Sequence, residues 1–244
     1  MKTPLLLLPG LLADARLFDC QVRHLSDVAQ PTVADLTVAD TIAKLATEAV
    51  RRMPAGRFAV AGLSMGGYVA LEVMRQVPER VSALALLNTN ARADSAESTE
   101  SRRRLMALAD RDFAAVNAAL VPKLLHPDHL KDARLTNLLD DMANSVGVQG
   151  FKSQQAAIIG RIDSRPHLAA IRAPTMVLAA REDAIMPMEV SEEMARGIPG
   201  ARLEVVEHCG HLSSIEQPEA VTALLRAWIG SLHRGFFHHK RVCD

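Results

Sequence analysis

The chain has 244 residues with 28 basic and 28 acidic side chains, so its formal net charge is zero. Proteins that bind nucleic acids or membrane surfaces electrostatically carry an excess of positive charge, so this balance argues against both classes. Apolar residues make up 49% and charged residues 23% of the chain, which is ordinary globular usage and excludes a chain that is disordered by composition. We expect one domain spanning residues 1–244, with a small inserted subdomain.

Short apolar runs alternate with helix-like stretches along the chain, the pattern of a parallel sheet flanked by helices in an α/β fold. We expect buried strands at Leu5–Leu8, Phe58–Ala61, Val81–Leu87, Thr175–Ala180 and Leu203–Val206. We expect helices at Thr41–Met53, Met65–Val77, Met188–Arg196 and Pro218–Leu232. Prolines mark the end of the second helix and the first turn of the last one.

The segment from about Ala91 to Ile171 lacks the strand pattern and predicts a helical cap inserted between the two halves of the sheet. An insertion over the strand ends would form a lid that shapes the substrate pocket; the alternative is that it packs only as extra helices. Its Arg102–Arg104 run is interpreted as a solvated helix face, with contact to a substrate carboxylate as the alternative. The basic tail at residues 233–244 lacks periodicity, so we expect it to be frayed.

The number of cysteines and the length of the apolar runs indicate the cellular compartment of the protein. Cys20, Cys209 and Cys243 are too few and too scattered for a disulfide framework, and none forms a CxxC metal or redox pair. The apolar run before Pro9 is too short for a secretory signal, and no run approaches the roughly 20 residues of a membrane span. We therefore expect a soluble cytoplasmic protein that binds neither membrane nor nucleic acid.

The sequence Gly62-Leu63-Ser64-Met65-Gly66 lies directly between a predicted strand and a predicted helix. A serine exposed on such a sharp turn is a nucleophile elbow, and the flanking glycines keep the turn free of Cβ clashes. The alternative is a glycine-rich turn that only tightens the junction. We interpret Ser64 as a catalytic nucleophile.

A serine hydroxyl needs a base to become nucleophilic at neutral pH. His208 and His211 both follow the last predicted strand. His211 is our choice because Gly210 lets the loop curl back over the sheet end, and His208 is the second candidate.

The base in turn needs a carboxylate that fixes its tautomer. Asp183 is our choice because it lies a short loop beyond the Thr175–Ala180 strand, with Glu182 and Asp163 as weaker alternatives. The order Ser64, Asp183, His211 is the one expected of an α/β-hydrolase, and each residue follows a predicted strand at its carboxyl end, where open α/β sheets place their sites.

A tetrahedral intermediate also needs hydrogen-bond donors for its oxyanion. The Met65 N–H at the start of a helix is one candidate, since the helix dipole favours negative charge there. The loop after the first strand is the expected source of a second, with the Leu11 N–H as our choice and the Leu12 N–H next.

Together these residues resemble the α/β-hydrolase superfamily, in its compact esterase and lactonase-like branch, from Thr3 to Leu232. The residues that carry the resemblance are Leu8-Pro9-Gly10-Leu11-Leu12, Gly62-Leu63-Ser64-Met65-Gly66-Gly67, Pro78-Glu79-Arg80-Val81, Ala173-Pro174-Thr175-Met176-Val177, Arg181-Glu182-Asp183 and Gly210-His211. The resemblance implies that Ser64, Asp183 and His211 are the triad and that Leu11 and Met65 form the oxyanion hole. Many relatives have His-Gly where this chain has Pro9-Gly10, a departure at the oxyanion loop.

The expected reaction is hydrolysis of a small carboxylic ester, thioester or lactone through an acyl-enzyme, without a metal or organic cofactor. Two alternatives remain open: a lyase or carbon–carbon hydrolase that uses the same triad, and a protein of the same fold that binds a small ligand without catalysis.

Overall fold

The computed structural model describes residues 2–238, in which six parallel strands form a single sheet. Its strands are β1 (Thr3–Leu8), β2 (Ala29–Val33), β3 (Phe58–Leu63), β4 (Val81–Leu87), β5 (Thr175–Ala180) and β6 (Arg202–Val206). The order across the sheet is β2-β1-β3-β4-β5-β6, so the two central strands are β3 and β4. The predicted α/β class and its five predicted strands are confirmed.

Strand β2 is the one strand among the described residues that the sequence pattern did not predict. It lies at the edge of the sheet and pairs only with β1, where Pro31 is opposite Leu5. Proline lacks a backbone donor and fits only an edge strand, and this strand is half-buried rather than continuously apolar. A short edge strand of this composition carries neither of the hydropathy patterns by which strands are recognised.

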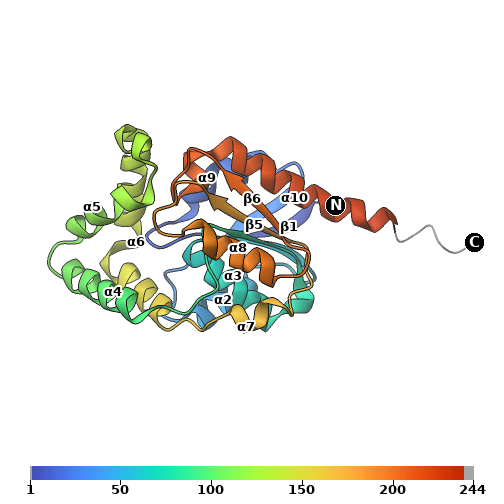
Figure 1. Ribbon diagram of the computed structural model, residues 1–244, viewed down its shortest axis with the longest axis horizontal. Coiled ribbons are helices and arrows are strands. Elements are labelled where there is room, and N and C mark those ends of the chain that lie inside the picture. Colours follow the sequence, from blue (N-terminus) through green and yellow to red (C-terminus); the bar gives the residue numbers. More distant parts are fainter. Residues whose placement is uncertain (1, 239–244) are drawn as a thin grey trace, which may run out of the picture.

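Helices cover both faces of the sheet because side chains alternate along each strand. Leu6 and Leu8 of β1 pack with α2 (Ile42–Arg51), α3 (Met65–Gln76) and α8 (Met188–Gly197). Leu5 and Leu7 pack on the other face, with α1 (Asp19–Leu25) and α10 (Pro218–His238). Figure 1 shows the sheet between these two helical layers.

The chain between β4 and β5 contains helices and no strand, as the sequence predicts. They are α4 (Ala96–Ala109), α5 (Phe113–Leu124), the 3-10 helix η3 (Pro127–Lys131), α6 (Ala133–Ile159) and α7 (Arg165–Leu168). Two further 3-10 helices, η1 (Ala15–Phe18) and η2 (Pro78–Arg80), lie earlier in the chain, before β4. Val116, Ala143 and Phe151 of the helices α5 and α6 form a small apolar cluster that also includes Leu12 of the loop after β1. Figure 1 shows α4, α5 and α6 gathered to the left of the sheet. The predicted limits of the insertion and its role as a lid stay predictions.

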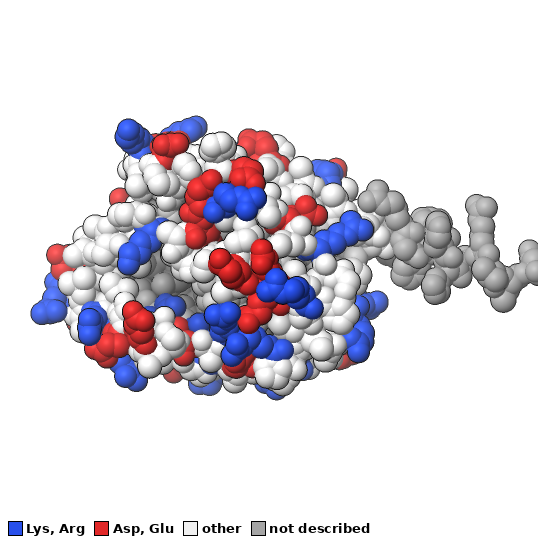
Figure 2. Space-filling model, viewed as in Figure 1, with Lys and Arg blue, Asp and Glu red and all other residues white. Residues whose placement is uncertain are grey.

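The C-terminal helix α10 follows the short α9 (Ser213–Glu216) and runs to His238, beyond the predicted end at Leu232. Part of the predicted frayed tail is therefore helical, and residues 239–244 lie outside the described residues. Figure 2 shows basic and acidic side chains interspersed over the face in view. Within residues 2–238, no helix has the length and apolarity to cross a membrane; the cytoplasmic location stays a prediction.

Candidate active site

Ser64 occupies the sharp turn between the central strand β3 and the helix α3. Its φ of 55° is a left-handed conformation that is strained for a residue with a side chain. A Cβ on Gly62 would overlap the Gly66 carbonyl oxygen, and a Cβ on Gly66 would overlap the Leu8 carbonyl oxygen. Both glycines are therefore required for the close approach of backbones that holds this turn.

A continuous chain of hydrogen bonds joins Ser64, His211 and Asp183. His211 Nε2 lies 2.8 Å from Ser64 Oγ, and His211 Nδ1 lies 3.0 and 2.9 Å from the two oxygens of Asp183. Asp183 is 8% exposed and His211 2% exposed, whereas Ser64 is half-buried. One nitrogen of the imidazole thus faces the carboxylate and the other faces the hydroxyl, the geometry by which a base accepts a serine proton.

The buried Asp183 carboxylate is held as an anion by several donors. The Asn88 amide donates to its Oδ2 at 3.0 Å, and the backbone N–H groups of Ile185 and Met186 donate to its Oδ1 at 2.9 Å. Burial raises the pKa of Asp183, but the facing His211 and these hydrogen bonds lower that pKa below its ordinary value of 3.8. The carboxylate is therefore ionised over the whole neutral range.

The loop that carries His211 is anchored to the helices between β4 and β5. The His211 N–H donates to the Leu124 carbonyl at 2.9 Å, at the end of α5. The buried Glu216 carboxylate accepts the Leu212 N–H at 3.2 Å and the His126 N–H at 2.7 Å, and also lies 2.8 Å from His129 Nδ1. These contacts tie the imidazole position to the packing of α5 and η3.

The alternative candidates lie outside this hydrogen-bond chain. Glu182 accepts the backbone N–H of Cys209 at 3.0 Å, and Asp163 pairs with Arg165. His208 is exposed and lies edge-on to the His126 ring. Among the candidates weighed, the structure therefore brings together the three that were preferred from the sequence.

Cys209 beside the proposed base is fully buried, and burial raises the pKa of its thiol. A thiol with a raised pKa is not a nucleophile at neutral pH. Cys209 and Cys20 are both free thiols. Cys209 is therefore a packing residue of the core.

A pocket of about 310 Å³ opens beside Ser64 and His211. Its walls come from the loop after β1, from the loop after β5 and from the helices α4, α5 and α6. Its polar lining side chains beyond Ser64 and His211 are Tyr68, Ser98, Ser101, Arg102, Lys123 and Gln155. Most of the remaining lining is Leu, Ile, Met and Ala, so the cavity suits a small, largely apolar molecule with a few polar groups.

Residues 3–218 match the family described as alpha/beta hydrolase fold. The chain belongs to this family. The match runs from β1 to the start of α10 and includes the turn of Ser64, the inserted helices and the loop of His211. The predicted superfamily and the α/β-hydrolase fold are thereby confirmed.

The chain is similar in sequence and structure to several named hydrolases and esterases. The protein named "Putative carbamate hydrolase RutD" of Azorhizobium caulinodans is 32% identical over 179 residues, or 71% of this chain and 66% of that protein. A pimeloyl-(acyl-carrier protein) methyl ester esterase of Neisseria meningitidis is 29% identical over 70% of this chain and 68% of that protein. A malate-bound esterase structure from Thermogutta terrifontis superposes with a TM-score of 0.87 at 29% identity, covering 96% of this chain and 91% of that one. The chain thus spans just under two thirds of the length of the first relative.

The loop after β1 carries the two backbone donors weighed for an oxyanion hole in this hydrolase fold. The Leu12 N–H donates to Gln154 Oε1 of α6 at 3.0 Å, so it is already occupied. Leu11 lines the pocket beside Ser64. Met65 begins α3, and the first turn of a helix leaves backbone N–H groups without intrahelical acceptors. Leu11 and Met65 therefore remain the pair predicted for the oxyanion hole.

Four residues that support this site were missed from the sequence. Asn88 and Ser213 extend the hydrogen-bond chain behind Asp183, Glu216 holds the loop of His211, and Gln154 holds Leu12. Asn88 alone gave a signal, because it directly follows β4 at the carboxyl edge of the sheet, where polar side chains meet. Ser213 and Gln154 act across long sequence separations that no motif records, and so does Glu216 in its contact with His126.

Proposed function

We propose that the protein is a serine hydrolase that cleaves a small carboxylic ester, thioester or lactone. The observation that carries the proposal is the hydrogen-bonded series Ser64 Oγ, His211 and Asp183, with its serine on a strained elbow beside the pocket. Two of the relatives named above are esterases, one an acyl-carrier-protein methyl ester esterase and one a thermophilic esterase. They support an ester bond as the target.

In the proposed reaction, Ser64 Oγ attacks the substrate carbonyl carbon while His211 Nε2 takes the serine proton. The carbonyl oxygen becomes an oxyanion, stabilised by the N–H groups of Leu11 and Met65. His211 then protonates the departing alcohol, thiol or ring oxygen, which leaves an acyl group on Ser64. Water activated by His211 releases the acid and regenerates the serine. Asp183 stays ionised and stabilises the imidazolium throughout.

The helices α4 to α6 act in this proposal as the cap of the pocket. They supply most of its polar lining and contact the loops of both His211 and Leu12. A cap that excludes water strengthens every electrostatic interaction at the reacting carbonyl.

A fluorophosphonate probe tests the proposed nucleophile. We expect mass spectrometry to find the adduct on the Ser64 peptide of the wild type, and to find none in Ser64→Ala or His211→Ala. Ser82→Ala is the matched control, because Ser82 Oγ is buried in β4 and has no hydrogen-bond partner among the described residues. A folded wild-type protein that does not react would overturn the proposal.

Turnover separates the hydrolase from the other uses of the same residues. We expect short-chain p-nitrophenyl esters to be cleaved over many turnovers, with an acyl-serine trapped at Ser64. Turnover without a trapped acyl-serine would assign the triad to a lyase or carbon–carbon hydrolase. Ligand binding without any turnover would assign the protein to the non-catalytic class.

A further inference from the structure

We propose that the substrate carries a carboxylate in addition to its scissile carbonyl, and that Arg102 in the pocket wall binds this carboxylate. This inference rests on the proposed hydrolase function and names the substrate class of the same site. A neutral ester of the same shape would be a poorer substrate of such a pocket than the anionic one.

Arg102 differs from the two arginines that follow it in the chain. Its side chain is 21% exposed and lines the pocket beside Ser64, whereas Arg103 and Arg104 are exposed on the outer face of α4. Arg104 pairs with Glu100 one turn earlier on the same helix. Of the three consecutive arginines, therefore, only Arg102 lines the pocket.

The acid next to Arg102 does not neutralise the positive charge around it. Asp94, with a side chain only 1% exposed, lies 3.2 Å from Arg102 Nε and 2.8 Å from Arg161 Nη1. One carboxylate is thus shared by two guanidinium groups, which are charged at any pH the protein meets. The cluster retains a net charge of +1 in a partly buried setting.

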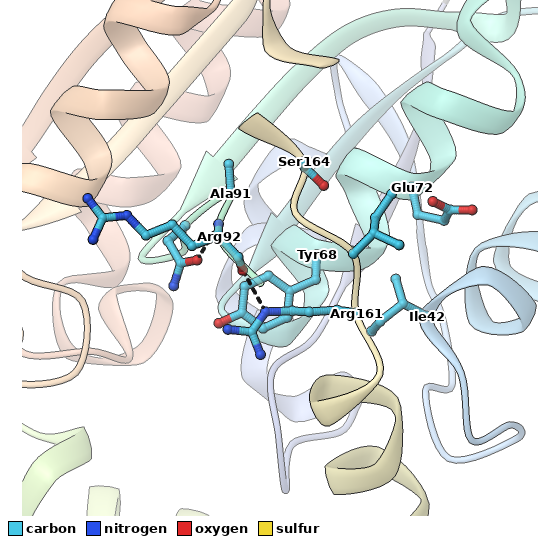
Figure 3. Close-up of a pocket in the computed structure, with 9 residues that line it drawn as sticks. Ile42, Tyr68, Glu72, Ala91, Arg92, Arg161 and Ser164 are labelled. Atoms are coloured by element: carbon cyan, nitrogen blue, oxygen red, sulfur yellow. Dashed lines mark hydrogen bonds between the residues drawn. The ribbon is translucent and has the colours of Figure 1, made fainter. Parts of the chain in front are cut away.

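Arg161 does not line the main pocket, although it contacts Tyr68, which does. Its guanidinium stacks over the Tyr68 ring at 4.3 Å, and its Nε donates to the Arg92 carbonyl oxygen at 2.9 Å, as Figure 3 shows. It borders a separate, very small cavity, whereas Tyr68 contributes to the walls of both. Arg102 is therefore the member of the charged cluster that a bound substrate reaches.

The Gln155 side chain beside Arg102 has one hydrogen-bond donor without a partner among the described residues. Its Oε1 accepts a hydrogen bond from Arg102 Nη1 at 3.0 Å, which fixes the orientation of the amide. Its Nε2 is buried and has no acceptor among the described residues, although Gln155 lines the pocket. An unpaired buried donor costs free energy, and a carboxylate bound beside Arg102 supplies the missing acceptor.

The rest of the lining fits an anionic substrate. Among the described lining residues there is no Asp or Glu, while the exposed Lys123 of α5 adds a second cation. A carboxylate that enters an apolar pocket loses hydration and needs a charged partner to offset that cost. A guanidinium provides it with two parallel hydrogen bonds.

Matched ester pairs test the proposal. The anionic substrates are the monomethyl esters of succinate, glutarate and adipate, and the neutral ones are the methyl esters of the corresponding monoamides, which have the same shape. Acid release gives kcat and KM for each. O-acetyl esters of short hydroxy acids and of their amides form a second arm, which places the carboxylate on the alcohol side.

We expect the wild type to favour the anionic member of the best pair by about 10- to 100-fold in kcat/KM, chiefly through KM. Arg102→Met removes this preference, because kcat/KM falls far more for the anionic member than for the neutral one. Arg103→Met, the adjacent exposed arginine, leaves both unchanged. The neutral ester also reports that the Arg102→Met protein is folded.

The outcomes separate the inference from the function on which it rests. Equal turnover of anionic and neutral esters by the wild type, or a preference that Arg102→Met leaves intact, overturns the role of Arg102 while the hydrolase stands. Failure of every ester together with no fluorophosphonate labelling overturns the proposed function itself. Preference in one arm alone identifies the acyl or the alcohol side as the carrier of the carboxylate.

Discussion

The carboxyl edge of the sheet and the helices α4 to α6 build the two halves of this site in different ways. At the sheet edge, Ser64, Asp183 and His211 each follow one strand closely, and parallel strands bring their ends together by topology alone. In the helices, the pocket lining comes from separate elements, with Arg102 on α4 and Gln155 on α6. The proposed chemistry therefore depends on strand order, and the proposed selectivity depends on helix packing.

Two connections join these halves. Gln154 of α6 holds the loop that carries Leu11 through the Leu12 N–H, and the Leu124 carbonyl of α5 holds the loop of His211. A change in the helices is thus expected to reach the reacting groups through backbone position, with smaller effects than a change at the sheet edge. The predictions below follow that order.

The largest effect is expected at the sheet edge from Asp183→Asn. An amide at this position cannot stabilise the imidazolium and favours the wrong tautomer of His211, so we expect kcat to fall by about 10⁴-fold. Steady-state kinetics on an ester substrate measures it. Asp163→Asn is the matched control, since Asp163 pairs with Arg165 outside the site, and it is expected to retain wild-type kcat.

The same substitution changes the pH dependence of stability. The pKa of Asp183 is lower in the folded protein than in the unfolded chain, where it is near 3.8. The ionised carboxylate therefore stabilises the fold at every pH above that unfolded-chain pKa. That contribution is lost as the pH falls through the lower folded-state pKa. The difference in unfolding free energy between wild type and Asp183→Asn should therefore shrink below about pH 4. A constant difference from pH 6 to pH 3 contradicts this electrostatic account.

Gly66→Ala is expected to break the elbow itself. The new methyl group would overlap the Leu8 carbonyl oxygen, a backbone atom that cannot turn aside, so we expect a loss of about 3 kcal/mol in unfolding free energy. Urea denaturation followed by circular dichroism measures it. Gly230→Ala is the control, because a Cβ there meets open space on α10 and should be neutral or stabilising. Equal stability of the two variants would show that the elbow tolerates a side chain.

Gln154→Ala tests the connection between the helices and the oxyanion loop. It leaves the buried Leu12 N–H without an acceptor, at a cost of about 1–3 kcal/mol. The loosened loop should lower kcat by about tenfold, less than the 10²–10³ expected from loss of an oxyanion donor. Gln149→Ala, exposed on the same helix, is expected to change neither quantity. An unchanged kcat in Gln154→Ala means that the helices do not position this loop.

The smallest effect is expected from Ser213→Ala, behind the aspartate. The Ser213 hydroxyl donates to Asn88 Oδ1 at 2.6 Å, and Asn88 in turn donates to Asp183. Its removal should cost about 1 kcal/mol and lower kcat a fewfold. Ser214→Ala is the control, since the buried Ser214 Oγ has no partner among the described residues. The prediction fails if thermal denaturation and kinetics do not distinguish the two variants.

The sequence by itself determined the sheet and the residues proposed to react. Continuous apolar runs predicted five strands, and Gly62-Leu63-Ser64-Met65-Gly66 predicted the elbow, because both signals lie within a few neighbouring residues. The edge strand β2 was missed because Pro31 and its polar neighbours interrupt the apolar run by which the other strands were recognised. These are local properties that a short stretch of chain carries with it.

Only the tertiary structure decided what surrounds those residues. It showed Arg102 facing the pocket rather than solvent, and it brought Gln154 to Leu12 across more than half the chain. It also set Glu216 and Asn88 behind the proposed triad. The physical reason is that such contacts depend on how whole helices pack against the sheet, and hydropathy along the chain does not encode which face of a polar helix turns inward.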